Sequence, residues 1–346
     1  MSGKVFFSAL DESRESDTID LDRKKCNVGG EKTMAQQGMI LFNALGTVCR
    51  VTAAADDVLL HRVREWVCGL DRRASLFRPD SEVVRLNQAA GREAVPVSDD
   101  LAVLLEAARQ CSRWSGGAFS ITAGPLAALW RQALRTGHVP EEGDLARAAA
   151  LVDDEGLLVD GPPGQRKAFL PRAGQAVDLG GIAKGYAVDR AAALLCGAGV
   201  TDFCLDFGGT LVVRGRPRMV DIRHPQPGVA GTMAGLTVRE GAVVTSGTYE
   251  QSRSVGPSRI HHIIDCRTGR PAASGVCSVT LLGRSAADLD ALATACLVLG
   301  PSASLPVLRR LPGPPVEAVF VTDSYDVLAT PGLQDHLRLR QAVPSV

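Results

Sequence analysis

Apolar and polar positions repeat along the chain in two different periods, and the period separates the predicted helices from the predicted strands. A period near 3.6 residues indicates an amphipathic helix, whereas strict alternation or a short apolar run indicates a strand. Helices are expected at residues 55–70, 98–115, 141–151, 182–195 and 286–299. Strands are expected at residues 40–52, 175–179, 202–205, 211–214, 219–223, 234–239, 242–245, 261–264, 276–282, 318–321 and 327–329. The last two strands are expected to form a closing hairpin.

The predicted helix at 98–115 carries clear signals at both ends. Ser98 is a suitable N-cap because Asp99 and Asp100 then lie in the first turn, and Gly116-Gly117 follows the last turn. Along the whole chain, helices and strands come in blocks rather than in strict alternation. This order predicts an α+β fold rather than a doubly wound parallel sheet.

The N-terminal stretch differs from the rest of the chain because charged and polar residues occur there without a period. We therefore expect residues 1–38 to be a flexible leader. One folded domain is expected over residues 39–332, followed by a C-terminal tail at 333–346.

The composition is that of an ordinary globular protein, with 45% hydrophobic and 22% charged residues. The 38 basic residues balance the 38 acidic ones, so neither a nucleic-acid surface nor a basic membrane patch is expected. The nine cysteines are odd in number and form no C-x-x-C pair, which favours buried thiols over disulfides or a zinc site. No apolar leader or membrane-spanning run is evident, and we expect a cytoplasmic protein.

The first candidate site is the segment from Asp178 to Tyr186. A predicted strand ends there in Gly180-Gly181, and a helix begins with Lys184 in its first turn. Free N–H groups at a helix start bind anions, and the lysine adds a positive charge. The glycine spacing matches neither a P-loop nor G-x-G-x-x-G. A plain strand–helix turn that needs glycine explains the same residues, so spacing alone leaves both interpretations open.

The second candidate site lies at the start of the predicted helix 286–299. Ser285 and Asp288 resemble a capping box, which explains Asp288 without a functional role. Asp290 and Thr294 are four residues apart and therefore share one helix face. An acid on a helix that is apolar nearly all round must be paired, capped or bound to a metal, and such oxygen ligands suit magnesium. An interaction of Asp290 with the helix dipole alone stays open.

Two further segments give weaker signals. His261 and His262 are adjacent in a predicted strand, so they point to opposite faces and do not form a joint metal site. A single strand histidine is more often a core residue than a catalyst. Thr245-Ser246-Gly247 follows an apolar strand and has the composition of an ordinary turn.

Taken together, the order and the residues of these motifs resemble those of the ApbE family of flavin transferases over roughly residues 40–332. The resemblance implies an α+β fold with mixed or antiparallel sheets and packed helices. The matching blocks are Leu45-Gly46-Thr47, residues 75–82 with 85–87, residues 115–122 with 124–126 and Trp130, residues 178–189, Thr245-Ser246-Gly247, residues 262–265 with Thr268-Gly269, and residues 290–294.

The resemblance implies a role for individual residues. The family's magnesium ligands match Asp290, Thr294 and the backbone carbonyl of Ala183, and its functionally important histidine matches His262. Manganese would suit the same oxygen ligands. The positions implied to bind FAD are Ser75, Leu76, Phe77, Arg78, Asp178, Gly181, Lys184, Thr245, Ser246, Gly247 and His262.

Three positions depart from the family pattern. Ser120 stands where Gly-Ala-Phe is usually followed by Asp, Thr210 stands where an acid is common, and Cys266 replaces a proline. The loss of two acids removes negative charge near a site that handles a cation or a proton.

The function implied by the resemblance is the transfer of FMN from FAD to a threonine or serine hydroxyl of a target flavoprotein, with release of AMP. His262 or a nearby carboxylate would take the proton of that hydroxyl. Two alternatives remain: a magnesium-dependent FAD diphosphatase, in which water replaces the hydroxyl, and a protein that binds FAD without turnover. The missing dinucleotide fingerprint argues against an NAD(P) oxidoreductase.

Overall fold

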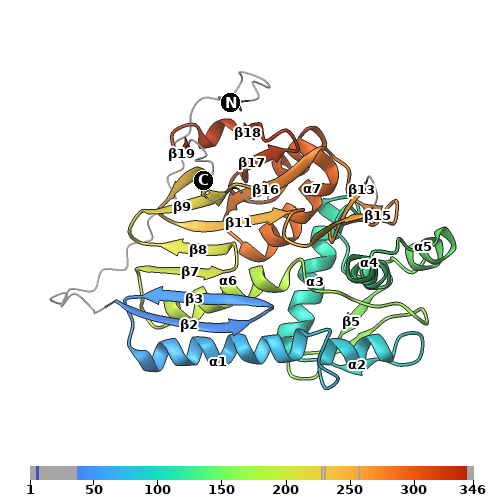
Figure 1. Ribbon diagram of the computed structural model, residues 1–346. Coiled ribbons are helices and arrows are strands. Elements are labelled where there is room, and N and C mark those ends of the chain that lie inside the picture. The colour runs from blue at the N-terminus through green and yellow to red at the C-terminus, as the bar shows by residue number, and fades with distance from the viewer. Residues whose placement is uncertain (1–4, 8–36, 227–228, 230, 256–257, 341–346) are drawn as a thin grey trace.

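The computed structural model describes residues 5–7, 37–226, 229, 231–255 and 258–340 (Figure 1). Its largest sheet has nine strands in the order β1-β18-β17-β16-β11-β8-β7-β3-β2. Neighbouring strands are antiparallel except for β1 and β18, which are parallel. The strands are β1 (Val5–Phe7), β2 (Gly38–Ala44), β3 (Thr47–Ala53), β7 (Phe203–Phe207), β8 (Thr210–Arg214), β11 (Gly241–Gly247), β16 (Val276–Gly283), β17 (Glu317–Thr322) and β18 (Val327–Ala329).

Smaller sheets flank this large one. They comprise β19-β10-β9, β12-β13, β14-β15 and β4-β6-β5. Their strands are β4 (Val95–Pro96), β5 (Leu158–Asp160), β6 (Lys167–Phe169), β9 (Arg218–Arg223), β10 (Thr232–Val238), β12 (Ser252–Val255), β13 (Ser258–His261), β14 (Ile264–Asp265), β15 (Arg270–Pro271) and β19 (Leu337–Leu339).

The helices are α1 (Asp57–Ala74), α2 (Glu82–Gln88), α3 (Asp99–Trp114), α4 (Gly124–Thr136), α5 (Glu142–Ala149), α6 (Ala183–Gly197) and α7 (Ala286–Arg309), with a short 3-10 helix at Pro331–Leu333. Ser98 caps α3 as predicted, since its hydroxyl accepts a hydrogen bond from the N–H of Leu101. The mostly antiparallel sheets and separate helices confirm the predicted α+β fold.

The large sheet separates two apolar cores. On one face, alternate strand residues such as Val51, Leu205 and Val244 pack with α1, α3, α6 and α7. On the other face, Val213 and Val243 pack with residues of β9 and β10. The period-two alternation seen in the sequence thus serves two interiors along β11, β16 and β17, whereas β2 and β3 leave one face exposed at Met39, Leu41 and Val48. Helix α7 lies in the larger core.

Three predicted strands are wrong in detail. Residues 40–52 form the hairpin β2–β3 rather than one strand, because Leu45 and Gly46 turn the chain with φ angles of 55° and 72°. Residues 175–179 are not a strand, and they make only an isolated parallel bridge between Ala123 and Ala176. The predicted strand 261–264 breaks into β13 and β14, with a bend at His262.

Two helices were not predicted, and one is longer than expected. Helix α4 begins with Gly124-Pro125, and a proline in the first turn is a helix-start signal that the sequence carried. Helix α2 is only seven residues long, too short for a clear period. Helix α7 runs on past the predicted end at residue 299 and contains non-helical backbone at Gly300, which precedes Pro301. Its length and composition alone would allow it to cross a membrane, but most of it is buried in the core.

The predicted leader and tail fall partly outside the described residues. Of residues 1–38, the structure describes Val5–Phe7 as β1, residue 37, and Gly38 as the first residue of β2, so the flexibility of the remainder stays a prediction. The ordered fold continues beyond residue 332, because Leu333 is buried and β19 pairs with β10. Residues 341–346 lie outside the described part.

Candidate active site

The starts of α6 and α7 are joined by a carboxylate that lies in neither first turn. Asp189 of α6 accepts hydrogen bonds from the backbone N–H groups of Ala286 at 3.0 Å and Ala287 at 2.9 Å. These N–H groups lie at the N-terminus of α7, where no helical carbonyl is available to them. Burial raises the pKa of Asp189 to about 6, although the two N–H groups oppose that rise. Asp189 therefore fixes α7 relative to α6.

Asp290 points from α7 to the first turn of α6. Its Oδ2 accepts a hydrogen bond of 3.0 Å from the N–H of Gly185, and its Oδ1 lies 3.3 Å from Nζ of Lys184. Only 2% of Asp290 is exposed. The prediction that this acid is partnered is therefore confirmed, and its partners are a helix N-terminus and a lysine.

Thr294 and Gly181 lie beside this pair. A Cβ on Gly181 would lie 3.6 Å from Oγ1 of Thr294 and 3.1 Å from the ring of Phe119. The glycine therefore allows the ring of Phe119 to pack closely against the turn before α6. Oγ1 of Thr294 is 3.4 Å from the carbonyl oxygen of Asp290, one helical turn earlier. Ala183 is the first residue of α6. The structure thus brings the residues of two separate predicted motifs into one place.

The donor set at this place suits a hard cation. Within the described ranges, no group of three or more His, Cys, Asp or Glu side chains is placed to hold a metal ion. A cation here would therefore depend on one carboxylate, a hydroxyl, a backbone carbonyl and oxygens from substrate or water. Magnesium accepts such a set because it retains several waters and takes other ligands from phosphates. The buried charge of Asp290, now balanced by Lys184, fits this requirement.

Asp178 shapes the glycine turn that precedes α6. Its Oδ1 accepts a hydrogen bond of 2.9 Å from the N–H of Gly180, and its Oδ2 lies 2.5 Å from Nη1 of Arg131. Both carboxylate oxygens already have partners. The structure therefore gives Asp178 a role in holding the turn, and direct contact with FAD stays a prediction.

His262 lies at the bend between β13 and β14. Its Nδ1 is 3.3 Å from the carbonyl oxygen of Gln251, and because a carbonyl only accepts, Nδ1 carries the hydrogen. Nε2 then has a free lone pair. Burial lowers the pKa of His262, the Gln251 carbonyl opposes this, and the positive charge of Lys184 lowers it further. The imidazole is thus neutral near pH 7, as a general base requires.

The predicted segment Thr245-Ser246-Gly247 forms the end of β11. Thr245 shares a hydrogen bond of 2.8 Å with the hydroxyl of Thr280 on β16. A Cβ on Gly247 would lie 2.3 Å from the ring of Tyr249, so only glycine allows that ring to fold back over the strand. The next residue, Glu250, was missed from the sequence. Desolvation raises the pKa of Glu250. The positive charge of Lys184 lowers this pKa and the negative charge of Asp290 raises it, so Glu250 is close enough to interact electrostatically with both.

The segment Ser75–Arg78, predicted to line the flavin end, lies at the surface after α1. Phe77 is 83% exposed, and its N–H donates to Oγ of Ser75 at 3.1 Å. Leu76 packs against the larger core, and Arg78 pairs with Asp80 at 3.3 Å. An exposed aromatic ring of this kind is free to meet a flat ligand, and its role toward flavin stays a prediction.

The three departures from the family pattern have different surroundings. Ser120 donates to Oδ1 of Asp154 at 2.7 Å, a partner that the sequence did not reveal. The hydroxyl of Thr210 is buried and lacks a hydrogen-bond partner among the described residues. Burial raises the pKa of the Cys266 thiol to about 12, helped by the charge of Asp154, so this thiol stays protonated.

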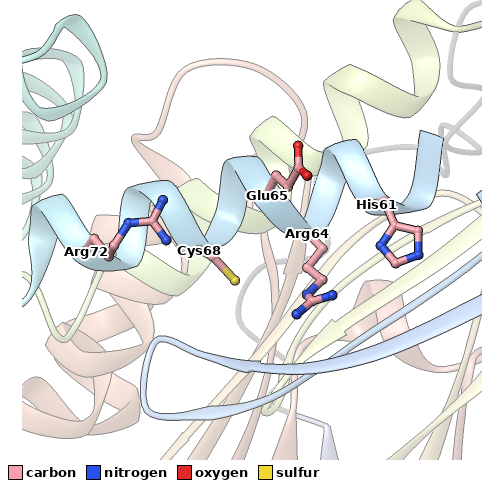
Figure 2. A pocket seen from close by; sticks show the side chains of 5 residues that line it. All are labelled: His61, Arg64, Glu65, Cys68 and Arg72. Carbon is pink, nitrogen blue, oxygen red and sulfur yellow. The ribbon is translucent and has the colours of Figure 1, made fainter. Parts of the chain in front are cut away.

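A hollow beside α1 is lined by other residues. It is an open groove of about 310 Å³ along α1, lined by His61, Arg64, Glu65, Cys68 and Arg72 (Figure 2). Its lining includes none of the predicted site residues. The groove therefore does not compete with the junction of α6 and α7 as the candidate site.

Comparisons with known proteins identify the family of this chain. The model of the ApbE family matches residues 45–320. An FAD:protein FMN transferase of Treponema pallidum is 34% identical over 344 residues, which cover 92% of this chain and 94% of that protein. Another, from Klebsiella pneumoniae, is 31% identical over 273 residues, covering 79% of this chain and 85% of that protein.

Solved structures are similar over most of their length. The ApbE protein from Thermotoga maritima superposes with a TM-score of 0.78 at 26% identity, covering 88% of this chain and 100% of that one. The flavin transferase ApbE from Vibrio cholerae gives a TM-score of 0.73 at 27% identity, covering 87% of this chain and 99% of that one.

Proposed function

The chain belongs to the ApbE family and is a flavin transferase, and we propose that it moves FMN from FAD to a threonine or serine hydroxyl of an acceptor protein and releases AMP. The observation that carries this proposal is the Asp290–Lys184–Gly185 cluster at the junction of α6 and α7. It combines a carboxylate, a cation and a helix N-terminus, which are the groups that a diphosphate and its cation require.

The proposed reaction exchanges the phosphoanhydride bond of FAD for a phosphoester bond to the acceptor. The acceptor hydroxyl oxygen forms a bond to the phosphorus of the FMN half, and the bond from that phosphorus to the bridging oxygen breaks. AMP leaves with the electron pair of the broken bond, and the hydroxyl proton passes to a base. Little covalent chemistry falls to the protein, so positioning and charge stabilisation dominate.

The start of α6 is suited to hold the diphosphate. The Gly180-Gly181 turn lets phosphate oxygens approach the backbone, and the helix N-terminus attracts negative charge. Lys184 adds a mobile positive charge, since its Nζ already lies 3.3 Å from Asp290 and 3.5 Å from the carbonyl oxygen of Gly180. We expect this lysine to turn from Asp290 toward phosphate when FAD and a cation bind.

Asp290, Thr294 and the carbonyl of Ala183 would hold magnesium, or manganese in its place. Bound there, the metal would neutralise charge on the diphosphate oxygens.

His262 is the residue we assign as the general base. Its Nδ1–H is held by the Gln251 carbonyl, which leaves Nε2 as the atom that accepts the proton. Its lowered pKa keeps that atom free of a proton near pH 7. Glu250 is the carboxylate that lies in the same electrostatic neighbourhood, and it is the alternative base.

The test is to incubate the protein with FAD, magnesium and a candidate acceptor protein, and to follow AMP release and the acceptor's mass. AMP together with an acceptor heavier by one FMN supports the proposal. AMP with FMN in solution, and no adduct on any acceptor presented, indicates the diphosphatase. FAD that stays bound and intact with magnesium indicates a binding protein without turnover.

A further inference from the structure

One buried carboxylate is held by the segment that joins α3 to α4. Asp154, which lies between α5 and β5, is 7% exposed. Its Oδ1 accepts hydrogen bonds from Oγ of Ser120 at 2.7 Å, from the N–H of Thr122 at 2.9 Å and from the hydroxyl of Thr122. Its Oδ2 is buried and has no hydrogen-bond partner in the described part of the chain. A buried acid with one oxygen unpaired costs folding free energy, so stability alone does not explain it.

Two of the three departures from the family pattern touch or face this carboxylate. Ser120, which stands at the position of the family's usual acid, is its hydrogen-bond donor. Cys266, which replaces the usual proline, has its thiol pKa raised partly by the charge of Asp154. A carboxylate therefore does lie beside Ser120, and it comes from a residue 34 positions further along the chain.

The cluster is connected to the candidate active site through the same short segment. The N–H of Asp178 donates to the carbonyl oxygen of Ile121 at 2.7 Å, which joins the segment to the glycine turn. The ring of Phe119 lies against Gly181, 3.1 Å from the place of a Cβ there. A carboxylate that fixes residues 120 and 122 therefore also fixes the wall beside Gly181.

We infer that Asp154 supplies from the loop after α5 the carboxylate that the family places at the position of Ser120, and that it is a positioning residue for the FAD site. Only one acid fits here. Oγ of Ser120 is 2.7 Å from Oδ1 of Asp154, and two carboxylates at that distance cannot both be ionised. The serine at 120 and the aspartate at 154 thus belong together: the acid has moved from position 120 to position 154. The link to FAD rests on the proposed function.

The experiment is a cycle of four proteins: wild type, Asp154→Asn, Ser120→Asp and the double variant. The first readout is the dissociation constant of FAD without magnesium, from flavin fluorescence, and the second is FMN transfer. Asp154→Asn should weaken FAD binding about tenfold, as loss of a supporting carboxylate does. Ser120→Asp should also weaken it and lower the melting temperature, because it places two acids together.

The decisive result is that Asp154→Asn has opposite effects on FAD affinity in the wild-type and Ser120→Asp backgrounds. Asp154→Asn should weaken FAD binding in the wild-type background and restore it to within about threefold of wild type in the Ser120→Asp background, where the acid is back in place. The matched control is Asp153→Asn, which removes the neighbouring acid that pairs with Arg172 and should change FAD affinity less than about threefold.

The outcomes separate the inference from the proposed function. If Asp154→Asn binds FAD as well as wild type, or weakens binding in both backgrounds, the exchange of acids is refuted. If Asp154→Asn does not fold, the double variant must fold and bind FAD, and its failure overturns the inference. If Asp154→Asn has opposite effects on FAD affinity in the two backgrounds while wild type transfers no FMN, the positioning role stands and the transferase proposal fails.

Discussion

A methyl group on Gly185 would lie 2.1 Å from the carbonyl oxygen of Ala286, so α6 and α7 meet backbone to backbone near their first turns. The same close approach brings the N–H of Gly185 to 3.0 Å from the Asp290 carboxylate. Backbone atoms of a packed helix cannot move aside as the end of a long side chain can. The geometry of the candidate site therefore depends on the absence of one side chain.

Gly185→Ala should force the two helices apart. We expect a loss of about 2–3 kcal/mol or more in the free energy of unfolding, because overpacking of a tight core is destabilising. FAD-dependent activity should fall with it, since Asp290 loses its N–H partner. Denaturant unfolding measures the first effect. The control is Gly197→Ala on the same helix, where the added Cβ would have no described atom within 4 Å apart from its chain neighbours and the nearby helix backbone. A Gly185→Ala protein as stable as this control would contradict the prediction.

Asp290→Asn keeps an acceptor for the N–H of Gly185 but removes the charge that a cation needs. Transfer should fall by more than about 100-fold, beyond the usual effect of losing a supporting group. Magnesium should also cease to raise the melting temperature, because ligand binding stabilises only the state that binds it. Asp288→Asn is the matched control, since Asp288 faces Cys111 at 3.8 Å. Retention of the magnesium shift in Asp290→Asn would remove the metal assignment.

Transfer by the wild type should be lost as the pH falls through the pKa of His262, which lies below the ordinary value of 6.5. Activity should fall on the acidic side because only the neutral imidazole accepts a proton. A lowered pKa keeps the imidazole neutral to lower pH. His262→Gln should lower kcat by about 100-fold or more while the FAD dissociation constant changes little.

A pH–rate profile of His262→Gln should lack the acid limb of the wild type. His261→Gln is the comparison, because Nε2 of His261 lies 3.1 Å from the Ala272 carbonyl and this ring is not assigned to the reaction. If the limb persists in His262→Gln, Glu250 becomes the base to examine.

Lys184→Met should weaken FAD binding about tenfold and make the remaining affinity less sensitive to salt, because a charge near the diphosphate is lost. It should also destabilise the protein without FAD by about 1–3 kcal/mol, since the buried Asp290 loses its cationic partner. Lys167→Met on β6 removes an exposed lysine and should do neither. An unchanged FAD affinity in Lys184→Met, measured by titration at two salt concentrations, would show that this lysine serves Asp290 alone.

The amino-acid sequence was sufficient to predict the features that depend on residues close along the chain. Asp290 and Thr294 share a face because they are four apart on a helix, and the apolar residues around them required a partner for the acid. Gly180-Gly181 and Lys184 marked the start of α6 in the same way. Such features follow from the period of the helix and from capping, which act over one or two turns.

Contacts between residues far apart in the sequence depend on how the helices and strands pack. Lys184 and Asp290 are 106 residues apart, and the tight contact between α6 and α7 is what joins them. Asp154 restores a carboxylate next to Ser120, although nothing near either residue in the sequence indicates it. Alternation along residues 40–52 likewise ran through the turn of a hairpin. Local periodicity is insensitive to such contacts, because they are set by how whole elements pack rather than by any one stretch of chain.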